Sequence, residues 1–166
     1  MNQKGPTANS PASAEEEPIR IRAVAIIARD GKVLFLRHRH PDPEREYWVV
    51  PGGGVLPGET AAQAVVREVR EEIQAEARVV RLLYVSDRPH CPEERELGLY
   101  FLCDIGNATP NPSSELLTRE GYVDELVFAD PAEVVRLRLF PEFLRRVLPA
   151  DAAAGFAGPT QYVEGE

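Results

Sequence analysis

Three glutamates and one arginine are the residues of this chain most able to do chemistry together. Glu68, Glu71 and Glu72 follow Arg67 in the segment REVREE. Residues three and four positions apart share a face of an α-helix, so the three carboxylates are expected on one narrow face. Like charges at that spacing repel by roughly 0.2–0.5 kcal/mol per pair, which favours a bound cation between them. Oxygen ligands of this kind suit a hard cation, Mg²⁺ or Mn²⁺.

A run of three glycines lies shortly before these carboxylates. Gly52, Gly53 and Gly54 allow a close backbone approach to metal and phosphate, with φ values that other residues avoid, so we predict that Gly52 and Gly54 contact the substrate. Taken alone, REVREE is typical of a solvated helix face, and a glycine run is typical of a flexible turn. The glycine run and Glu59 at a fixed distance from the helix favour a site instead.

The segment resembles the signature of the Nudix hydrolase family. That signature is Gly, five residues, Glu, seven residues, then Arg-Glu-apolar-any-Glu-Glu-any-Gly-apolar. Gly53, Glu59 and residues 67–72 match it, whereas Gln74 replaces the usual glycine and Ala75 is a small final apolar residue. Because glycine there serves the backbone, we expect a locally changed helix end, costing on the order of 1 kcal/mol, and an intact site.

The resemblance implies a Mg²⁺-dependent pyrophosphohydrolase. Water would attack a phosphorus and cleave a phosphoanhydride in a nucleoside diphosphate-linked substrate. The resemblance also implies metal binding by the Gly53 carbonyl with Glu68, Glu71 and Glu72. It implies that Glu59 holds the loop and that Arg67 orients the glutamates.

The catalytic base stays open at this point. The candidates are Glu71 and Glu72 in the helix and Glu115, Glu120 and Glu125 before the last predicted strand. Glu120 and Glu125 rank above Glu115 because they lie nearer that strand, although each of the three also fits an ordinary surface acid.

Residues that would bind the substrate are less sharply marked. Arg37 and Arg39 alternate along a strand and therefore share a face, which suits either phosphate binding or a solvated strand edge. Tyr47 or Trp48 would suit stacking on a base, although Trp48 beside two valines is more typical of core.

Composition narrows the class of protein. The 166 residues fit one domain, and the net charge of −8 argues against a general nucleic-acid surface. Cys91 and Cys103 are too few for a disulfide framework. No apolar run has transmembrane length, and the N-terminus has no apolar signal region, so we expect no membrane partner and a cytoplasmic location.

The pattern of elements predicts an α/β fold with a mixed sheet. Residues 1–18 are expected to be a disordered arm and 149–166 a flexible tail. Between them we expect strands over 19–28, 33–40, 47–50, 78–86, 97–105 and 125–128. Helices are expected over 60–74, from 130 and over 141–148, and polar loops over 87–96 and 107–121. The order resembles the Nudix α/β/α sandwich over 19–148, and the resemblance often implies a homodimer.

Local signals define two of these elements further. Asp30-Gly31 between two apolar runs indicates a hairpin turn. Thr60 and Gln63 fit a capping box at the start of the carboxylate helix. Beside the carboxylate face we expect an apolar stripe that packs on the core, formed by Ala62, Val65, Val66, Val69 and Ile73.

Two other functions are compatible with the same fold. One is a non-catalytic nucleotide-binding sensor, and the other is an isomerase of isoprenyl diphosphates. A degenerate sensor would be expected to lose metal glutamates, and all three are present. No His or Cys arrangement favours the isomerase.

Overall fold

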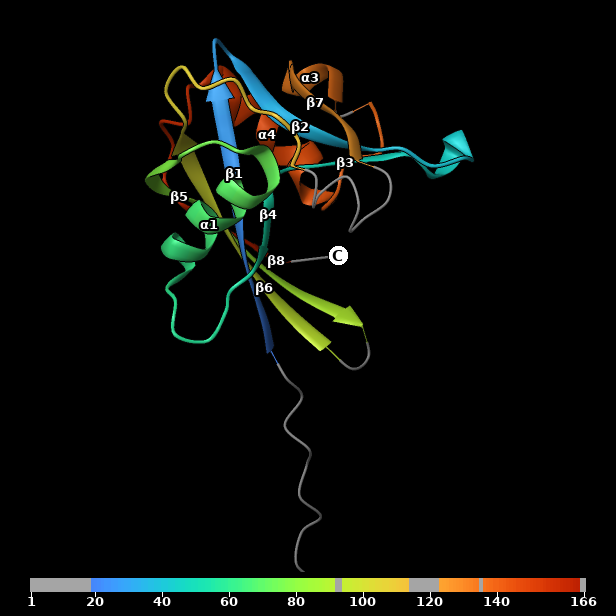
Figure 1. Cartoon of the computed structure of the whole chain (residues 1–166). Coiled ribbons are helices and arrows are strands. Elements are labelled where there is room, and N and C mark those ends of the chain that lie inside the picture. The colour runs from blue at the N-terminus through green and yellow to red at the C-terminus, as the bar shows by residue number, and fades with distance from the viewer. Residues whose placement is uncertain (1–18, 92–93, 114–122, 135, 165–166) are drawn as a thin grey trace, which may run out of the picture.

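A computed structural model describes residues 19–91, 94–113, 123–134 and 136–164 (Figure 1). The expected N-terminal arm, Glu115 and Glu120 lie outside the described residues. No helix within these ranges is long and apolar enough to cross a membrane. The elements are β1 (Ile19–Arg29), β2 (Lys32–His38), the 3-10 helix η1 (Pro43–Arg45), β3 (Tyr47–Val49), β4 (Gly52–Gly54), α1 (Ala61–Ile73), β5 (Arg78–Cys91), β6 (Glu94–Asp104), β7 (Val123–Ala129), α3 (Pro131–Val134), α4 (Phe143–Ala153) and β8 (Gln161–Glu164).

Strand β1 is the centre of a mixed sheet. It runs parallel to β6 and antiparallel to β2 and β4, in a sheet ordered β3-β2-β1-β6-β5-β8, with β7 on β2. The turn from β1 to β2 is made by Asp30 and Gly31, whose φ values are 51° and 74°. Positive φ at both central residues is what a two-residue hairpin turn requires, so the predicted Asp-Gly hairpin is confirmed.

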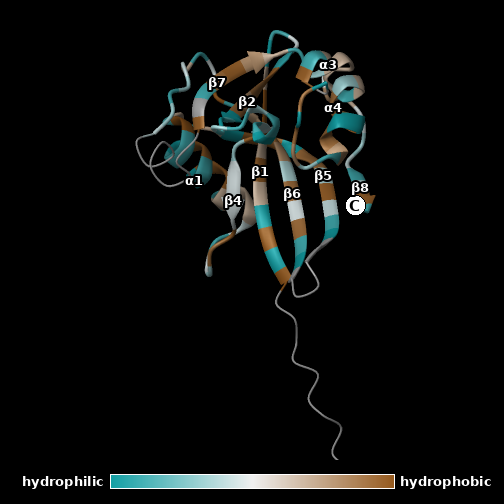
Figure 2. Ribbon diagram, turned by 90° about the vertical axis from the view of Figure 1, so that its right-hand side faces the viewer, coloured by the Kyte–Doolittle hydropathy of each residue, from teal (hydrophilic) through white to brown (hydrophobic). Residues whose placement is uncertain are grey.

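Both faces of the sheet are buried. Because side chains alternate along a strand, Val24 and Ile26 of β1 join a core with α3 and α4, whereas Ala25 and Ile27 join a second core with α1. The apolar bands along β1, β5 and β6 are seen in Figure 2. This arrangement confirms the predicted α/β/α sandwich with a mixed sheet. Cys103 is a buried free thiol in the second core, and burial raises its pKa to about 12.

The described part of the polar loop expected over 87–96 is instead strand, since β5 runs through Cys91 and β6 begins at Glu94. The ladder continues through Asp87↔Leu97, Arg88↔Glu96 and Pro89↔Arg95. Two ion pairs cross the two strands here, Arg88 with Glu96 and Arg95 with Asp87. Opposite charges on facing strands stabilise a sheet, so a polar sequence was compatible with strand structure.

The C-terminal segment also differs from the expected flexible tail. Helix α4 continues through Pro149 to Ala153, and β8 then pairs in parallel with β5. Asp151 accepts hydrogen bonds from the Tyr84 hydroxyl at 2.7 Å and from Gln161 Nε2 at 2.8 Å. These contacts hold the segment against the sheet through residue 164.

Candidate active site

Helix α1 begins and ends at well-defined caps. Thr60 Oγ1 accepts from the Gln63 N–H at 3.2 Å, and Gln63 Oε1 accepts from the Thr60 N–H at 2.8 Å, which confirms the predicted capping box. At the other end Gln74 adopts a left-handed conformation with φ 55° and donates its N–H to Arg70 O at 3.2 Å. Gln74 thus takes the left-handed conformation that suits glycine.

The buried side of α1 differs slightly from the predicted stripe. Ala64, Val65, Val69 and Ile73 are buried against the sheet, whereas Ala62, expected to be buried, is exposed. The apolar stripe orients the helix, so Arg67 and the glutamates next to it are directed toward the β4 loop.

Arg67 is the centre of the charged cluster. Its Nη2 donates to Glu59 Oε1 at 2.7 Å and to the Gly54 carbonyl at 3.0 Å. Its Nη1 donates to Glu68 Oε1 at 2.7 Å and to Glu71 Oε2 at 3.0 Å. The planar guanidinium can serve several acceptors at once, and it thereby holds the glutamates and the glycine loop in one arrangement.

Glu59 closes the loop between β4 and α1. Its Oε1 also accepts from the Leu56 N–H at 2.7 Å. The hydrogen bond from Arg67, followed by that from Leu56, holds the pKa of Glu59 below its usual range. The same Glu59–Arg67 bond raises the pKa of Arg67, so both groups stay charged near neutral pH.

Two of the three glycines are required by close contacts. A Cβ on Gly52, whose φ is 147°, would lie 2.5 Å from the Ala23 carbonyl of β1. A Cβ on Gly53 would lie 2.4 Å from Glu68 Oε1. The Gly52 N–H donates to Glu72 Oε2 at 2.9 Å. The glycine strand thus positions two glutamates that are four residues apart on α1.

These groups fit a site for a hard cation. No three His, Cys, Asp or Glu side chains in the described ranges form a ready-made metal cage. However, the Glu68 carboxylate fills the space beside Gly53 that a Cβ would occupy. Mg²⁺ takes only one or two protein carboxylates and completes its shell with water and substrate phosphate, so an open, oxygen-only donor set matches its chemistry.

A cleft of about 330 Å³ opens beside Glu72 and Gly52. Its floor is the sheet, and its wall contains His38 and Tyr47, whose rings stack at a centroid distance of 4.5 Å. Phe140 meets Tyr47 edge-on at 5.8 Å. The residues that line the cleft are Arg22, Val24, Leu36, His38, Tyr47, Val49, Val50, Gly52, Glu72, Arg88, Glu96, Tyr100, Phe140 and Pro141.

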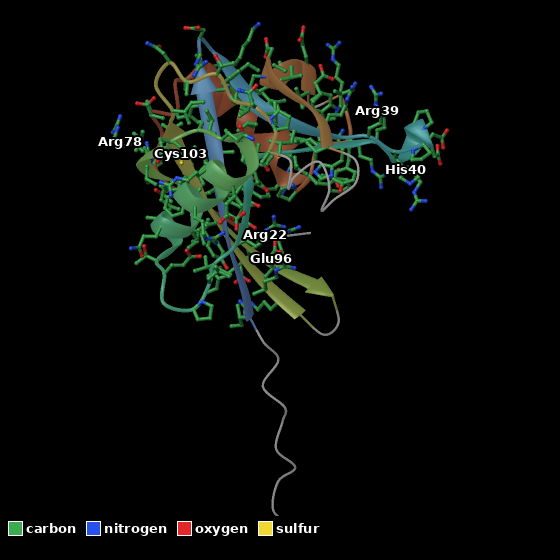
Figure 3. The ribbon with its side chains drawn as sticks, viewed as in Figure 1. Arg22, Arg39, His40, Arg78, Glu96 and Cys103 are labelled. Atoms are coloured by element: carbon green, nitrogen blue, oxygen red, sulfur yellow. The ribbon has the colours of Figure 1, made fainter. Side chains whose placement is uncertain are left out.

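The two arginines that were predicted to bind the substrate do not line this cleft. Arg37 forms an ion pair with Glu125 at 2.7 Å and lies over the Trp48 ring at 5.8 Å. Arg39 follows the end of β2, is exposed, and lies at the periphery in Figure 3. Glu125, the ion-pair partner of Arg37, is likewise absent from the residues that line the cleft.

Several cleft residues were missed in the sequence. They come from four strands: the register of β1, β5 and β6 brings Arg22, Arg88 and Glu96 together, and His38 joins them from β2. A signal existed for one of them: Arg22 stands two residues before Val24, so it continues the core-facing side of β1. Glu96 likewise shares a strand face with Tyr100, four residues later, but the prediction of a polar loop over 87–96 obscured this pattern.

The fold and the carboxylate helix together define a family. The family description NUDIX domain matches residues 19–150, and the chain belongs to this family. Among solved structures, the E. coli ORF135 protein superimposes with a TM-score of 0.66 at 26% identity, covering 84% of this chain and 95% of that one.

Curated relatives carry hydrolase names. An ADP-ribose pyrophosphatase of Methanocaldococcus jannaschii is 35% identical over 48% of this chain and 47% of its own length. A CTP pyrophosphohydrolase of Escherichia coli is 46% identical over 33% of this chain and 41% of its own. The NAD-capped RNA hydrolase NudC of Photorhabdus laumondii is 34% identical over 70% and 44%. The chain spans less than half the length of these three relatives.

Proposed function

We propose that this chain is a Mg²⁺-dependent pyrophosphohydrolase that cleaves a phosphoanhydride in a nucleotide-linked substrate, with Mn²⁺ as an alternative cation. The observation that carries the proposal is the Arg67 cluster, which joins Glu59, Glu68 and Glu71 to the glycine loop beside a cleft. The names of the relatives support it, since they describe hydrolases of ADP-ribose, CTP and NAD-capped RNA.

Some of the signature residues would hold the cation, and another would take part in the reaction itself. Glu68, Glu71 and the Gly53 carbonyl would hold the cation, with Arg67 fixing both carboxylates at 2.7 and 3.0 Å. A bound Mg²⁺ polarises phosphoryl oxygens and lowers the pKa of water.

Glu72 is our candidate for the general base. It is the signature glutamate that lines the cleft, and the Gly52 N–H orients its carboxylate at 2.9 Å. A base must lie within hydrogen-bond reach of the proton it takes, and a carboxylate on the cleft wall satisfies that condition for a water bound there. Glu71 has a side chain that is 46% exposed, which suits a metal ligand at the outer edge of the site.

A substrate panel tests the proposal directly. The purified chain would be incubated with nucleoside triphosphates, ADP-ribose, other nucleotide sugars and dinucleoside polyphosphates, each with Mg²⁺, Mn²⁺ or chelator. Chromatography would separate the products. We expect one class to be cleaved only when the cation is present. Cation-independent cleavage, or nucleotide-dependent thermal stabilisation without any cleavage, would overturn the proposal, and the second result would favour a sensor.

A further inference from the structure

The cleft contains a second charged group, separate from the Arg67 cluster. Arg22 of β1, Arg88 of β5 and Glu96 of β6 all line it. Strand register places them together, since Arg88 faces Glu96 and Arg22 faces Gly98, two residues further along β6. Figure 3 shows Arg22 and Glu96 beside each other on the sheet.

Glu96 is a carboxylate buried in the protein, only 2% exposed. Its Oε1 accepts a hydrogen bond from Arg88 Nη2, and Oε2 has no partner among the described residues. Buried carboxylates normally have their acceptor capacity satisfied, so an oxygen left over beside a cleft indicates room for a donor from a ligand.

Arg22 and Arg88 also have hydrogen-bond donors without an acceptor. Within the described ranges, each guanidinium gives one hydrogen bond, Arg22 Nη2 to the Gly52 carbonyl at 3.0 Å and Arg88 Nη2 to Glu96. The Nε atoms of both arginines are buried without an acceptor. The floor therefore presents unused donors next to an unused acceptor.

We propose that Glu96 and Arg88 together read the hydrogen-bonding edge of the substrate's nucleobase. This inference rests on the proposed function, because it assigns the recognition step of the same site. A phosphate would fit this subsite poorly, since the Glu96 carboxylate would repel it. A neutral ring that carries a donor next to an acceptor complements the pair on both sides.

The wall of the cleft suits such a ring. His38 and Tyr47 present stacked rings, and Phe140 closes against Tyr47. Val24, Leu36 and Val49 add apolar surface. Flat heterocycles bind in clefts that combine aromatic and apolar walls with a few placed polar groups.

Arg22, which lines the cleft together with the base-reading pair, is connected to the reacting groups. Arg22 donates to the Gly52 carbonyl at 3.0 Å, and the N–H of the same glycine donates to Glu72 at 2.9 Å. A single residue of β4, Gly52, thus separates the Arg22 guanidinium from Glu72, the proposed general base. A nucleotide lying along the floor would place its phosphates at Glu72 and its base at Glu96.

Paired nucleotides isolate the chemistry of Glu96. Cytosine and uracil, like adenine and hypoxanthine, differ by exchanging an amino donor for a carbonyl acceptor, with the neighbouring ring nitrogen changing in the opposite sense. Each base therefore carries one donor and one acceptor on this edge, in opposite order within a pair. A Glu96 acceptor held beside an Arg88 donor matches one order and not the other, because a carboxylate cannot donate. Glu96→Gln keeps an oxygen for Arg88 and adds an NH₂ donor, so the variant should accept either partner.

The experiment measures affinities of the full-length chain for CMP, UMP, AMP and IMP by isothermal titration calorimetry. Ribose 5-phosphate serves as the probe without a base. We expect wild type to favour one member of a pair by about tenfold or more, the range of a hydrogen bond to a charged group. Glu96→Gln should bring that ratio close to one and leave ribose 5-phosphate unaffected. Glu76→Gln, the same change in the exposed ion pair with Arg70, is the matched control and should keep the wild-type ratio.

Three results would overturn the inference. The first is equal affinity of wild type for both members of each pair. The second is an unchanged affinity ratio in Glu96→Gln. The third is a loss of affinity in Glu96→Gln that is equal for the nucleotides and for ribose 5-phosphate. If Glu96→Gln does not fold, Arg88→Lys keeps a positive partner for the carboxylate and is expected to reduce the same ratio. Binding of a monophosphate does not depend on cleavage, so the two proposals can fail separately. Hydrolysis can be observed without base discrimination, and base discrimination can be observed without hydrolysis.

Discussion

Replacing Gly53 with alanine is the sharpest test of how the glycine strand positions the carboxylates. The added Cβ would lie 2.4, 2.5 and 2.7 Å from Glu68 Oε1, Cδ and Oε2. An ordinary contact is 3.4 Å or longer, so the carboxylate must move by about 1 Å. The backbone at Gly53 carries no left-handed φ, and the three atoms nearest to the added Cβ all belong to the Glu68 side chain.

The size of the effect follows from that displacement. A shift of about 1 Å in a catalytic group can lower turnover by roughly 100-fold, whereas moving the end of one partly exposed side chain changes stability little. We therefore expect Gly53→Ala to lose about two orders of magnitude in kcat and to keep a thermal midpoint close to wild type.

Two neighbouring glycines serve as comparisons. Gly54→Ala meets no atom within 4 Å, and its carbonyl can still accept from Arg67, so its loss of turnover should be much smaller. Gly52→Ala would strike the β1 backbone and should lower the thermal midpoint itself. Steady-state kinetics with saturating Mg²⁺ and thermal unfolding would be measured for all three variants. Equal turnover in Gly53→Ala and wild type would refute the assigned contact between Gly53 and Glu68.

Three further changes test the helix and its caps. Glu71→Ala should lower turnover by roughly 10²–10⁴-fold in a kinetic assay while unfolding as wild type does, because its side chain is 46% exposed and its removal relieves like-charge repulsion; normal turnover would exclude Glu71 from the site. The pKa of Glu59 is lowered in the fold, so its charge stabilises the protein above the unfolded pKa and that contribution disappears as pH falls through the folded value. Urea unfolding should therefore show Glu59→Gln destabilised at neutral pH and approaching wild type below about pH 4, and a constant difference would contradict this. Gln74→Gly should raise the free energy of unfolding by about 0.5–1 kcal/mol without changing turnover, since φ is 55° there, and a lower denaturation midpoint would contradict the strain argument.

The signature helix was predictable from sequence because its information is local. A capping box, an apolar stripe and carboxylates at helical spacing are all encoded within about four turns. The Asp30-Gly31 hairpin was predictable for the same reason, since two residues suffice to define the turn. The burial of Ala64 in place of Ala62 shows the limit of prediction from local sequence. Which position at the edge of an apolar stripe is buried depends on a small rotation of the helix about its axis, and packing against the sheet decides that rotation.

The polar hairpin and the C-terminal strand were not predictable in the same way. Arg88 and Glu96 look like a loop in sequence, and they become strand residues only because their side chains pair across β5 and β6. Residues 161–164 form a strand because β5 offers them an edge. In both cases the stabilising partner lies elsewhere in the chain.

The sequence by itself determined the family, the carboxylate face and the glycine loop, since fixed spacing along one segment specifies them. The tertiary structure alone decided the cleft. Arg22, Arg88 and Glu96 meet there because parallel and antiparallel registers align β1, β5 and β6 on one face of the sheet, and His38 of β2 lines the same cleft. A pairing register is set by the packing of both sheet faces, and a shift of one residue would turn each of these side chains to the opposite face.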